Sequence, residues 1–294
     1  MALTFGIEME MASPLRHGQV ADALNAAGLN IPAIAAPYSG RDYTKWQVKD
    51  DVTIPTNGRL PWKVEVVSPV LTWDDPRHLE DLATVTRVLN EIGARVLRPQ
   101  SARRTAGLHV HMEMASIGQD ALARWGRIWS GRQNVTDTLV RSGRERGGRY
   151  SEWCAVLSGS AWDRFVTAAR SGDARALTGV ASSHGYAVNT QWFLERGTLE
   201  VRQRDGSINF RKIMGWVGYI RATRLHAESN ATYRTTNGDY LSWLVDMGFL
   251  SEDHRRWVER RGTGSPAPSA PAPTDPVAPA TTDRLARLRS LQRV

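Results

Sequence analysis

The chain has 294 residues, of which 41% are hydrophobic and 23% are charged, and its formal net charge is +8. These values are typical of a globular protein long enough to bury a core, in one large domain or two small ones. No apolar run approaches the roughly 20 residues of a membrane-spanning helix. The only cysteine, Cys154, excludes an internal disulfide and a cysteine-rich zinc cluster.

The N-terminal residues indicate where the protein acts, and the distribution of charge indicates which class of partner it binds. The alternating segment Phe5-Gly6-Ile7-Glu8-Met9-Glu10 interrupts the apolar stretch that a signal peptide requires, so we expect a cytoplasmic protein. The arginines are scattered and form no basic stripe, which argues against nucleic acid as a partner. Attraction of acidic small molecules such as ATP explains the positive charge equally well.

Hydrophobic periodicity predicts the elements of the fold. Alternation with period two predicts strands at residues 3–11, 46–54, 62–70, 108–114 and 198–204. Helical periodicity predicts a helix that begins at Asp75-Pro76, one over residues 122–139 and one over residues 208–226. Half-buried alternation is typical of antiparallel strands. We therefore expect an α+β fold with a largely antiparallel sheet, one polar catalytic face, and helices packed on the other face.

The composition changes sharply after Arg261. Residues 263–282 contain six prolines among Ala, Ser, Thr and Gly, which is typical of a disordered linker. Residues 283–294 then place Leu285, Leu288 and Leu291 at helical spacing among arginines. We expect a catalytic domain at 1–262, a linker at 263–282, and at 283–294 either a short basic helix that docks on a protein partner or a solubilising tail.

The polar faces of the predicted strands carry groups suited to chemistry. Alternation places side chains two residues apart on the same face. These faces hold, in chain order, Glu8 and Glu10, then His109 and His111, then Glu200, Arg202 and Arg204, while Asp51 and Glu65 stand in the second and third strands. A single strand of this kind is typical of a solvated surface. Together they are typical of a divalent-cation site with arginines that hold phosphoryl oxygens, and Mg²⁺ suits the carboxylates best.

Five segments in this order resemble the amidoligase family, a branch of the superfamily that includes glutamine synthetase and gamma-glutamylcysteine ligase. They are Gly6–Glu10, Trp46–Ile54, Glu65–Leu71, Ala106–His111 and Thr198–Arg202. The resemblance spans roughly residues 4 to 220 and implies a fold like the glutamine synthetase catalytic domain. Val52 and Thr53 depart from the family's Asp-Gly-Ser sequence, which leaves the role of Asp51 less defined.

The resemblance also implies a role for each residue of the site. Glu8, His109 and Glu200 correspond to ligands of one metal, and Glu10 and Glu65 to ligands of a second. His111 and Arg202 correspond to phosphate-contacting positions, with Arg202 facing the transferred phosphoryl group. Asn189, in the segment Tyr186-Ala187-Val188-Asn189, corresponds to a position lining the substrate or nucleotide pocket, and Asp51 to a group that positions or deprotonates the amine.

The implied activity is an ATP- and Mg²⁺-dependent ligase that forms an amide bond through an acyl phosphate, using two or more Mg²⁺ ions or Mn²⁺ in their place. Two alternatives stay open. His-x-His on a strand is also a zinc-binding arrangement, so a zinc hydrolase that uses His109 and His111 is the first. The second is a nucleotide-binding structural protein without turnover. The number of acids favours hard, oxygen-seeking cations over one catalytic zinc. The sequence identifies neither the carboxylate nor the amine substrate.

Overall fold

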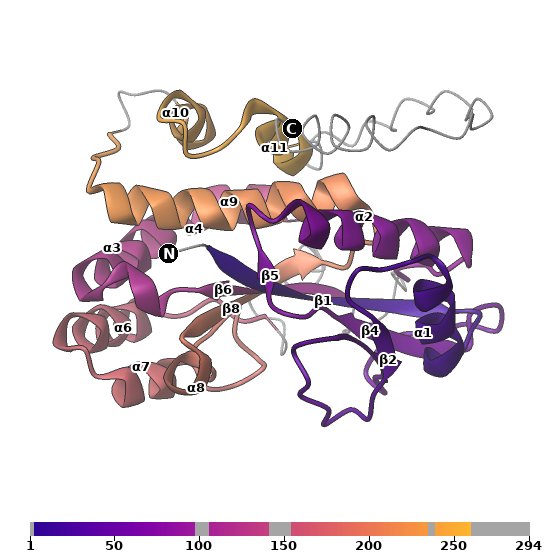
Figure 1. Ribbon diagram of the computed structural model, residues 1–294. Coiled ribbons are helices and arrows are strands. Elements are labelled where there is room, and N and C mark those ends of the chain that lie inside the picture. The colour runs from indigo at the N-terminus through magenta and orange to yellow at the C-terminus, as the bar shows by residue number, and fades with distance from the viewer. Residues whose placement is uncertain (1–2, 98–105, 141–153, 235–238, 260–294) are drawn as a thin grey trace.

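A computed structural model describes residues 3–97, 106–140, 154–234 and 239–259. One mixed sheet crosses the middle of the molecule, and helices lie along one of its faces and at its ends (Figure 1). The strands are β1 (Thr4–Ser13), β2 (Ala33–Ala35), β3 (Trp46–Asp50), β4 (Trp62–Val67), β5 (Leu71–Thr72), β6 (Gly107–Glu113), β7 (Val188–Asn189) and β8 (Thr198–Asp205). All five predicted strands are present.

The helices of the described residues are α1 (His17–Ala26), α2 (Pro76–Glu91), α3 (Gln119–Gly131), α4 (Gln133–Leu139), α6 (Gly159–Ser171), α7 (Ala174–Val180), α8 (Phe193–Arg196), α9 (Phe210–Ser229), α10 (Tyr240–Asp246) and α11 (Glu252–Glu259), with a 3-10 turn at Ala115–Ile117. None of these described helices is long and apolar enough to cross a membrane. The predicted linker and terminal helix lie outside the described residues.

The strand order in the sheet is β2-β3-β4-β1-β6-β8-β7, and β5 pairs with the start of β1. Only the β2–β3 pair is parallel among these strands. The prediction of an α+β fold with a largely antiparallel sheet is therefore confirmed. Because β1 lies between β4 and β6, its two glutamates stand near the middle of the sheet.

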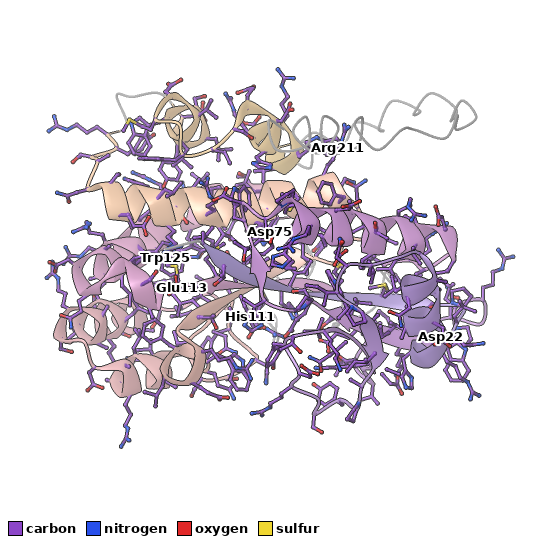
Figure 2. All side chains as sticks on the ribbon, in the orientation of Figure 1. Asp22, Asp75, His111, Glu113, Trp125 and Arg211 are labelled. Atoms are coloured by element: carbon purple, nitrogen blue, oxygen red, sulfur yellow. The ribbon has the colours of Figure 1, made fainter. Side chains whose placement is uncertain are left out.

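One face of the sheet is apolar and is covered by α2 and α9 (Figure 1). The apolar residues of β1 that sequence alternation assigned to this face, Phe5, Ile7, Met9 and Met11, are at most 2% exposed. α2 begins where expected, with Pro76 in its first turn and Asp75 just before it (Figure 2). The Asp75 side chain accepts a hydrogen bond from the Arg77 N–H. The opposite face of the sheet is thereby left for polar side chains.

α10 and α11 form an outer layer on α9 (Figure 1). Close contact is allowed by Gly218 of α9, where a Cβ atom would lie 2.9 Å from Nδ1 of His254 in α11. The ring of His254 also packs edge-on against Trp73, with ring centroids 5.4 Å apart. The sequence analysis did not predict this layer.

The predicted helix over residues 122–139 is two helices, so that prediction needs correction. α3 ends at Gly131 and α4 begins at Gln133, with Arg132 at φ −114° and ψ 15° between them. The Arg132 guanidinium lies over the ring of Tyr233, 4.4 Å from its centroid. The break turns the chain while the apolar pattern continues through it, which is why periodicity alone joined the two helices.

A β-bulge between β6 and β8 changes the face on which Arg204 lies. Val110 pairs with Val201, but Leu108 pairs with Arg204, so Arg202 and Gln203 together oppose His109. The extra residue turns Arg204 onto the apolar face, where its guanidinium lies 5.3 Å from the ring centroid of Trp216 in α9. Strict alternation placed Arg204 on the polar face beside Arg202, and that placement is wrong.

Candidate functional site

Cross-strand register gathers the charged residues on the polar face. Lys49 of β3 pairs with Glu65 of β4, which pairs in turn with Glu10 of β1. Two residues along β1, Glu8 pairs with His109 of β6. Directly opposed residues of neighbouring strands point to the same side. Two adjacent rows of charged groups therefore share the middle of this face.

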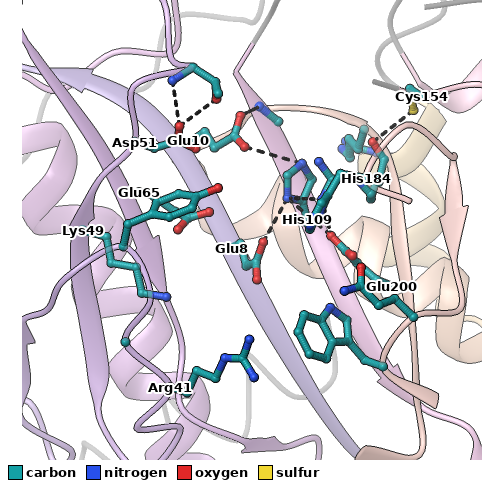
Figure 3. A pocket seen from close by; sticks show the side chains of 18 of the residues that line it. Glu8, Glu10, Arg41, Lys49, Asp51, Glu65, His109, Cys154, His184 and Glu200 are labelled. Carbon is teal, nitrogen blue, oxygen red and sulfur yellow. Dashed lines mark hydrogen bonds and ion pairs between the residues drawn. The ribbon is translucent and has the colours of Figure 1, made fainter. Parts of the chain in front are cut away.

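A pocket of about 500 Å³ opens over these rows (Figure 3). The sheet forms its floor, and two segments outside the sheet form its sides. Tyr38 and Arg41 come from the loop before β3, and Trp192 and Arg196 come from the segment that includes α8. The volume is in the usual range for small-molecule sites.

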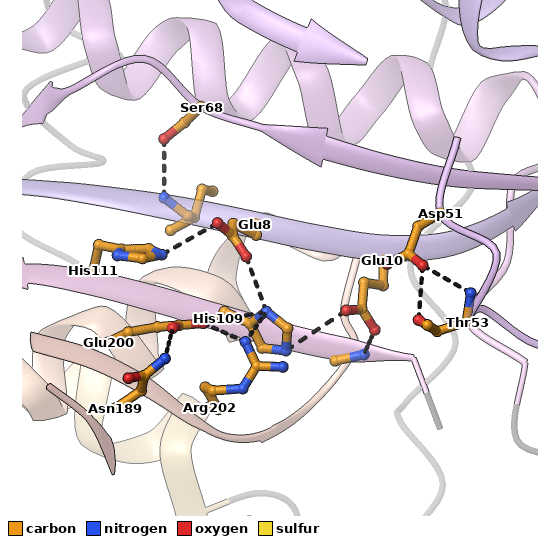
Figure 4. Close-up of polar contacts among 12 residues, drawn as sticks. Glu8, Glu10, Asp51, Thr53, Ser68, His109, His111, Asn189, Glu200 and Arg202 are labelled. Atoms are coloured by element: carbon orange, nitrogen blue, oxygen red, sulfur yellow. Dashed lines mark hydrogen bonds and ion pairs between the residues drawn. The ribbon is translucent and has the colours of Figure 1, made fainter. Parts of the chain in front are cut away.

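One part of the site pairs each acid with a base, and we call Glu8, His109, His111, Glu200 and Arg202 the paired half (Figure 4). The two Glu8 oxygens lie 3.0 Å from Nδ1 of His109 and 3.2 Å from Nε2 of His111. Arg202 donates a hydrogen bond to Oε1 of Glu200, and its Nη1 lies 3.3 Å from Nδ1 of His109. Both glutamates therefore have internal cationic or hydrogen-bonding partners.

These contacts determine the charge state of the paired half. Burial raises the pKa of Glu8, but the hydrogen bonds to His109 and His111 outweigh it and hold the pKa well below its usual value. Burial likewise opposes ionisation of Glu200, whose pKa is nevertheless lowered by Arg202. The pKa of His111 is raised, because its contact with Glu8 outweighs burial. The contacts within the paired half thus favour the charged forms of Glu8, Glu200 and His111.

The neighbouring acidic half consists of Glu10, Asp51 and Glu65. One carboxylate oxygen from each lies within 4.8 Å of the others, which is close enough for one cation to contact all three. Glu10 accepts a 2.6 Å hydrogen bond from the Gly107 N–H and lies 3.7 Å from Nε2 of His109. Glu65 makes no hydrogen bond or ion pair with any residue in the described part of the chain.

The surroundings of the acidic half oppose the ionisation of two of its carboxylates, those of Glu10 and Glu65. Burial and the charges of Glu8 and Glu10 raise the pKa of Glu65 well above its usual value, and the charge of Lys49 offsets this only in part. Burial also raises the pKa of Glu10, against the influence of His109. Carboxylates this close repel one another unless a cation lies among them. The acidic half therefore has the composition and the electrostatics of a site for a hard divalent cation.

Local backbone features hold these groups in place. A Cβ atom at Gly107 would lie 2.5 Å from Nε2 of His109, so only glycine allows this ring to lie against the strand. The Ser68 hydroxyl accepts a 2.9 Å hydrogen bond from the Ile7 N–H and so extends the β1–β4 pairing beside Glu8 (Figure 4). Both residues belong to segments that carry the family resemblance.

The turn after β3 explains the two departures from the family sequence. Oδ1 of Asp51 accepts hydrogen bonds from the Thr53 N–H at 2.7 Å and from the Thr53 hydroxyl at 2.8 Å. A threonine hydroxyl serves this turn as a serine would. Val52 is 74% exposed, so a larger residue meets no obstacle there. Asp51 therefore keeps a fixed orientation in the pocket.

The structure groups the predicted ligands differently from the resemblance. The ligand atoms of Glu8, His111 and Glu200 lie within 4.8 Å of one another, and His109 lies between this set and the acidic half. Asp51 joins Glu10 and Glu65. The predicted assignment had His109 in the first set and left Asp51 outside the second.

Two predicted cofactor contacts are also placed differently. Asn189 is fully buried behind the pocket, where its amide donates a 2.9 Å hydrogen bond to Oε2 of Glu200. It orients a carboxylate instead of lining the pocket. Arg204, on the bulge, has its guanidinium on Trp216. Asn189 does not border the pocket, whereas Arg204 does, and the nucleotide contacts of both residues stay predictions.

Three cationic residues of the pocket were missed by the sequence analysis. They are Lys49, Arg41 and Arg196. Lys49 shares a strand face with Asp51, so alternation could have identified it. Arg41 and Arg196 come from a loop and a one-turn helix, where no periodicity signals their orientation.

Comparison with known proteins places the whole site inside one family. A family model described as "Putative amidoligase enzyme" matches residues 1–223, which include every residue of the paired half and the acidic half. The match ends within α9, before the outer layer of α10 and α11. No curated protein matches the chain.

Proposed function

This chain belongs to the amidoligase family, and we propose that it is an ATP- and Mg²⁺-dependent ligase that joins a carboxylate to an amine. The observation that carries the proposal is the pair of adjacent ligand sets on one sheet face, Glu8–His111–Glu200 and Glu10–Asp51–Glu65. Each offers three ligand atoms within 4.8 Å. Adjacent sites for two divalent cations suit phosphoryl transfer from a nucleotide.

The reaction requires activation of the acid. A carboxylate does not condense with an amine in water, because its oxide is a poor leaving group. Transfer of the ATP γ-phosphoryl group to a carboxylate oxygen releases ADP and gives an acyl phosphate. The neutral amine then attacks the carbonyl carbon, the C–O bond to phosphate breaks, and an amide and inorganic phosphate result. The amine proton leaves to solvent or to a nearby base.

The ligand sets fit magnesium in chemistry as well as in spacing. Mg²⁺ prefers oxygen ligands, and the acidic half supplies only carboxylates. Glu65 is buried there without a hydrogen-bonded partner, and burial together with repulsion from Glu8 and Glu10 raises its pKa; a bound cation would offset both effects. When bound, Mg²⁺ supplies charge neutralisation for the phosphates. Asp51 suits cation binding better than the proton removal we expected from the sequence, since its position belongs to this set.

Arg202 is the residue best placed to stabilise the transferred group. Its side chain is about 10% exposed, borders the pocket and is held by Glu200 beside His109. Burial lowers the pKa of Arg202, but Glu200 outweighs it and raises the pKa, so the guanidinium stays charged. A fixed planar cation suits the equatorial oxygens of a phosphoryl group in flight.

The geometry disfavours the zinc hydrolase alternative. His109 and His111 both contact Glu8, and neither of the three-ligand groups found among the described residues contains both histidines. A catalytic zinc site would need the two rings to share one ion with a third ligand. The carboxylate-rich acidic half would also stay unexplained.

Oxygen-isotope transfer tests the proposed function. The enzyme is incubated with Mg²⁺, ATP, hydroxylamine as a generic amine, and a pool of amino, mono- and dicarboxylic acids labelled with ¹⁸O in their carboxylates. A ligase moves one label from the acid into inorganic phosphate and forms a hydroxamate. Glu8→Gln should lose both products. Inorganic phosphate that carries no ¹⁸O, or ATP cleavage that does not depend on an added acid, would contradict the proposal.

A further inference from the structure

The pocket has a third charged surface that takes no part in the chemistry described above. Arg41, Lys49 and Arg196 border it, and we call these three residues the cationic wall. Figure 3 shows Lys49 and Arg41 pointing toward the same space from one side, while Glu200 lies across it. The wall stands beside the ligand sets and is separate from Arg202.

Lys49 is the deepest member of the wall. It is 6% exposed, yet it forms no hydrogen bond or ion pair with any residue that the structure describes. Its cross-strand partner is Glu65, which acts on it only through space. A buried ammonium without a direct partner is costly unless a ligand completes its surroundings. If Glu65 binds a cation, Lys49 is left to face an anion in the pocket.

The two arginines are held by aromatic rings. The Arg196 guanidinium lies 4.0 Å from the ring centroid of Trp192 and 4.4 Å from that of Tyr43. Arg41 lies 5.2 Å from the same Trp192 ring. Stacking fixes the plane of a guanidinium while N–H groups at its edge can still bind an oxyanion. Nε of Arg196 also lies 3.8 Å from Oε1 of the exposed Glu195, so its terminal N–H groups are the ones offered to the pocket. Arg41 has no hydrogen-bonded carboxylate among the described residues.

From these contacts we infer that the cationic wall binds a second anionic group on the carboxylic acid substrate, which makes that substrate a diacid or a similarly anionic acid. The inference rests on the proposed function, because it requires the reacting carboxylate to lie at the ligand sets. Under the same proposal the nucleotide phosphates would also bind at those ligand sets. A further cluster of three cations beside them suits a charge on the other reactant.

Calorimetry with simple acids tests the inference. Glutarate, valerate and inorganic phosphate are titrated into the full chain with Mg²⁺ and the non-hydrolysable analogue AMPPNP. Glutarate and valerate have the same number of carbons and differ in the second carboxylate. We expect glutarate to bind about 10-fold more tightly than valerate or better, since a charge-assisted contact is worth at least that ratio.

Arg41→Gln and Arg196→Gln should each weaken glutarate binding by about 10-fold and leave valerate unchanged. Arg16→Gln is the matched control, because Arg16 also lies over a tryptophan, 4.3 Å from the ring centroid of Trp62, but does not border the pocket. Lys49→Gln provides a second test at the buried member of the wall. Thermal unfolding confirms that each variant folds.

Two results would overturn the inference. One is equal binding of glutarate and valerate by the unaltered chain. The other is a loss of AMPPNP or phosphate affinity in the arginine variants with glutarate binding unchanged, which would assign the wall to the nucleotide. Selective glutarate binding without ¹⁸O transfer would support anion binding by the cationic wall and count against the ligase proposal. Failure of the inference and failure of the proposed function are therefore distinguishable.

Discussion

The paired half and the acidic half lie on the same sheet face, but the pKa values of their glutamates are shifted in opposite directions. Each carboxylate of the paired half contacts His109, His111 or Arg202. In the acidic half, Glu65 has no direct partner in the described chain, and its pKa is raised where that of Glu8 is lowered. The same residue type is therefore shifted in opposite directions on two neighbouring strands of one sheet.

This difference indicates that the two halves respond differently to ligands. The paired half is held in shape by its own hydrogen bonds, so a ligand must compete with His111 and Arg202 for the glutamates. In the acidic half, Lys49 and His109 only partly offset the effects that raise the pKa of Glu65 and Glu10, so a cation would supply counter-charge there. We expect the acidic half to bind a metal by itself and the paired half to do so together with a nucleotide. The following predictions test that division.

The largest effect is expected at Arg202. Arg202→Lys keeps the charge but loses the planar fork that faces the phosphoryl group, so kcat should fall by roughly 10²-fold or more. The KM for ATP should change by only a few-fold, because the contact strengthens in the transition state. Steady-state ADP release measures both. An equal change in kcat and KM would assign Arg202 to ordinary nucleotide binding.

The next effect concerns Glu8, the shared partner of both histidines. Glu8→Gln removes a metal ligand and the charge that pairs with His109 and His111, so affinity for Mg²⁺–AMPPNP should fall by about 10- to 100-fold. Glu113→Gln is the control, because Glu113 lies on the same strand as both histidines but pairs with Arg224 and Ser116. Calorimetry that finds unchanged nucleotide affinity in Glu8→Gln would exclude Glu8 from the site.

A smaller effect is expected behind the pocket. Asn189→Ala removes the amide that orients Glu200, so metal affinity with nucleotide present should fall by roughly 10-fold, as for other partners of metal ligands. Metal binding by the acidic half without nucleotide should not change. If metal affinity falls equally with and without nucleotide, Asn189 supports the fold as a whole, and the division between the halves is not supported.

The smallest effect is on stability, and it has a defined pH dependence. The pKa of Glu65 is raised in the folded protein, so the protonated form of Glu65 stabilises the fold. This stabilisation is complete below the unfolded-state pKa and is lost as the pH rises through the folded-state pKa. Glu65→Gln cannot ionise. With EDTA present, this variant should gain on the order of 1 kcal/mol over the natural chain at neutral pH and nothing near pH 4.

Urea unfolding across that pH range measures the difference. Glu91→Gln is the control, because Glu91 pairs with Arg87 on the surface and should change stability by about 0.5 kcal/mol or less. A gain for Glu65→Gln that is larger in acid than at neutral pH has the wrong sign for this account. It would mean that Glu65 is stabilised in its ionised form without a metal.

Sequence alternation was enough to predict the five strands and, outside the bulge between β6 and β8, the side chains that share each face. The shared face of Glu8 and Glu10 follows directly from period two, since Ile7 and Met9, which alternate with them, are apolar and buried. The start of α2 followed from Asp75 and Pro76. These predictions succeeded because each depends on the residue's own neighbours in the chain.

The parts that could not be predicted depend on register and on irregular backbone. Alternation shows that His109 and His111 share a face, but only the pairing of β6 with β1 and β8 shows which of them meets Glu8 and Glu200 as a ligand set. The bulge that turns Arg204 away inserts one residue without any glycine or proline to mark it. The cationic wall comes from a loop and a one-turn helix.

Manganese titration without nucleotide tests the division between the halves most directly. Electron paramagnetic resonance counts free Mn²⁺, so it gives the number of ions bound by each variant. We predict one ion bound to the natural chain, lost in Glu65→Gln and retained in Glu8→Gln. Retention in Glu65→Gln with loss in Glu8→Gln would show that the first cation binds the paired half, and it would contradict the account.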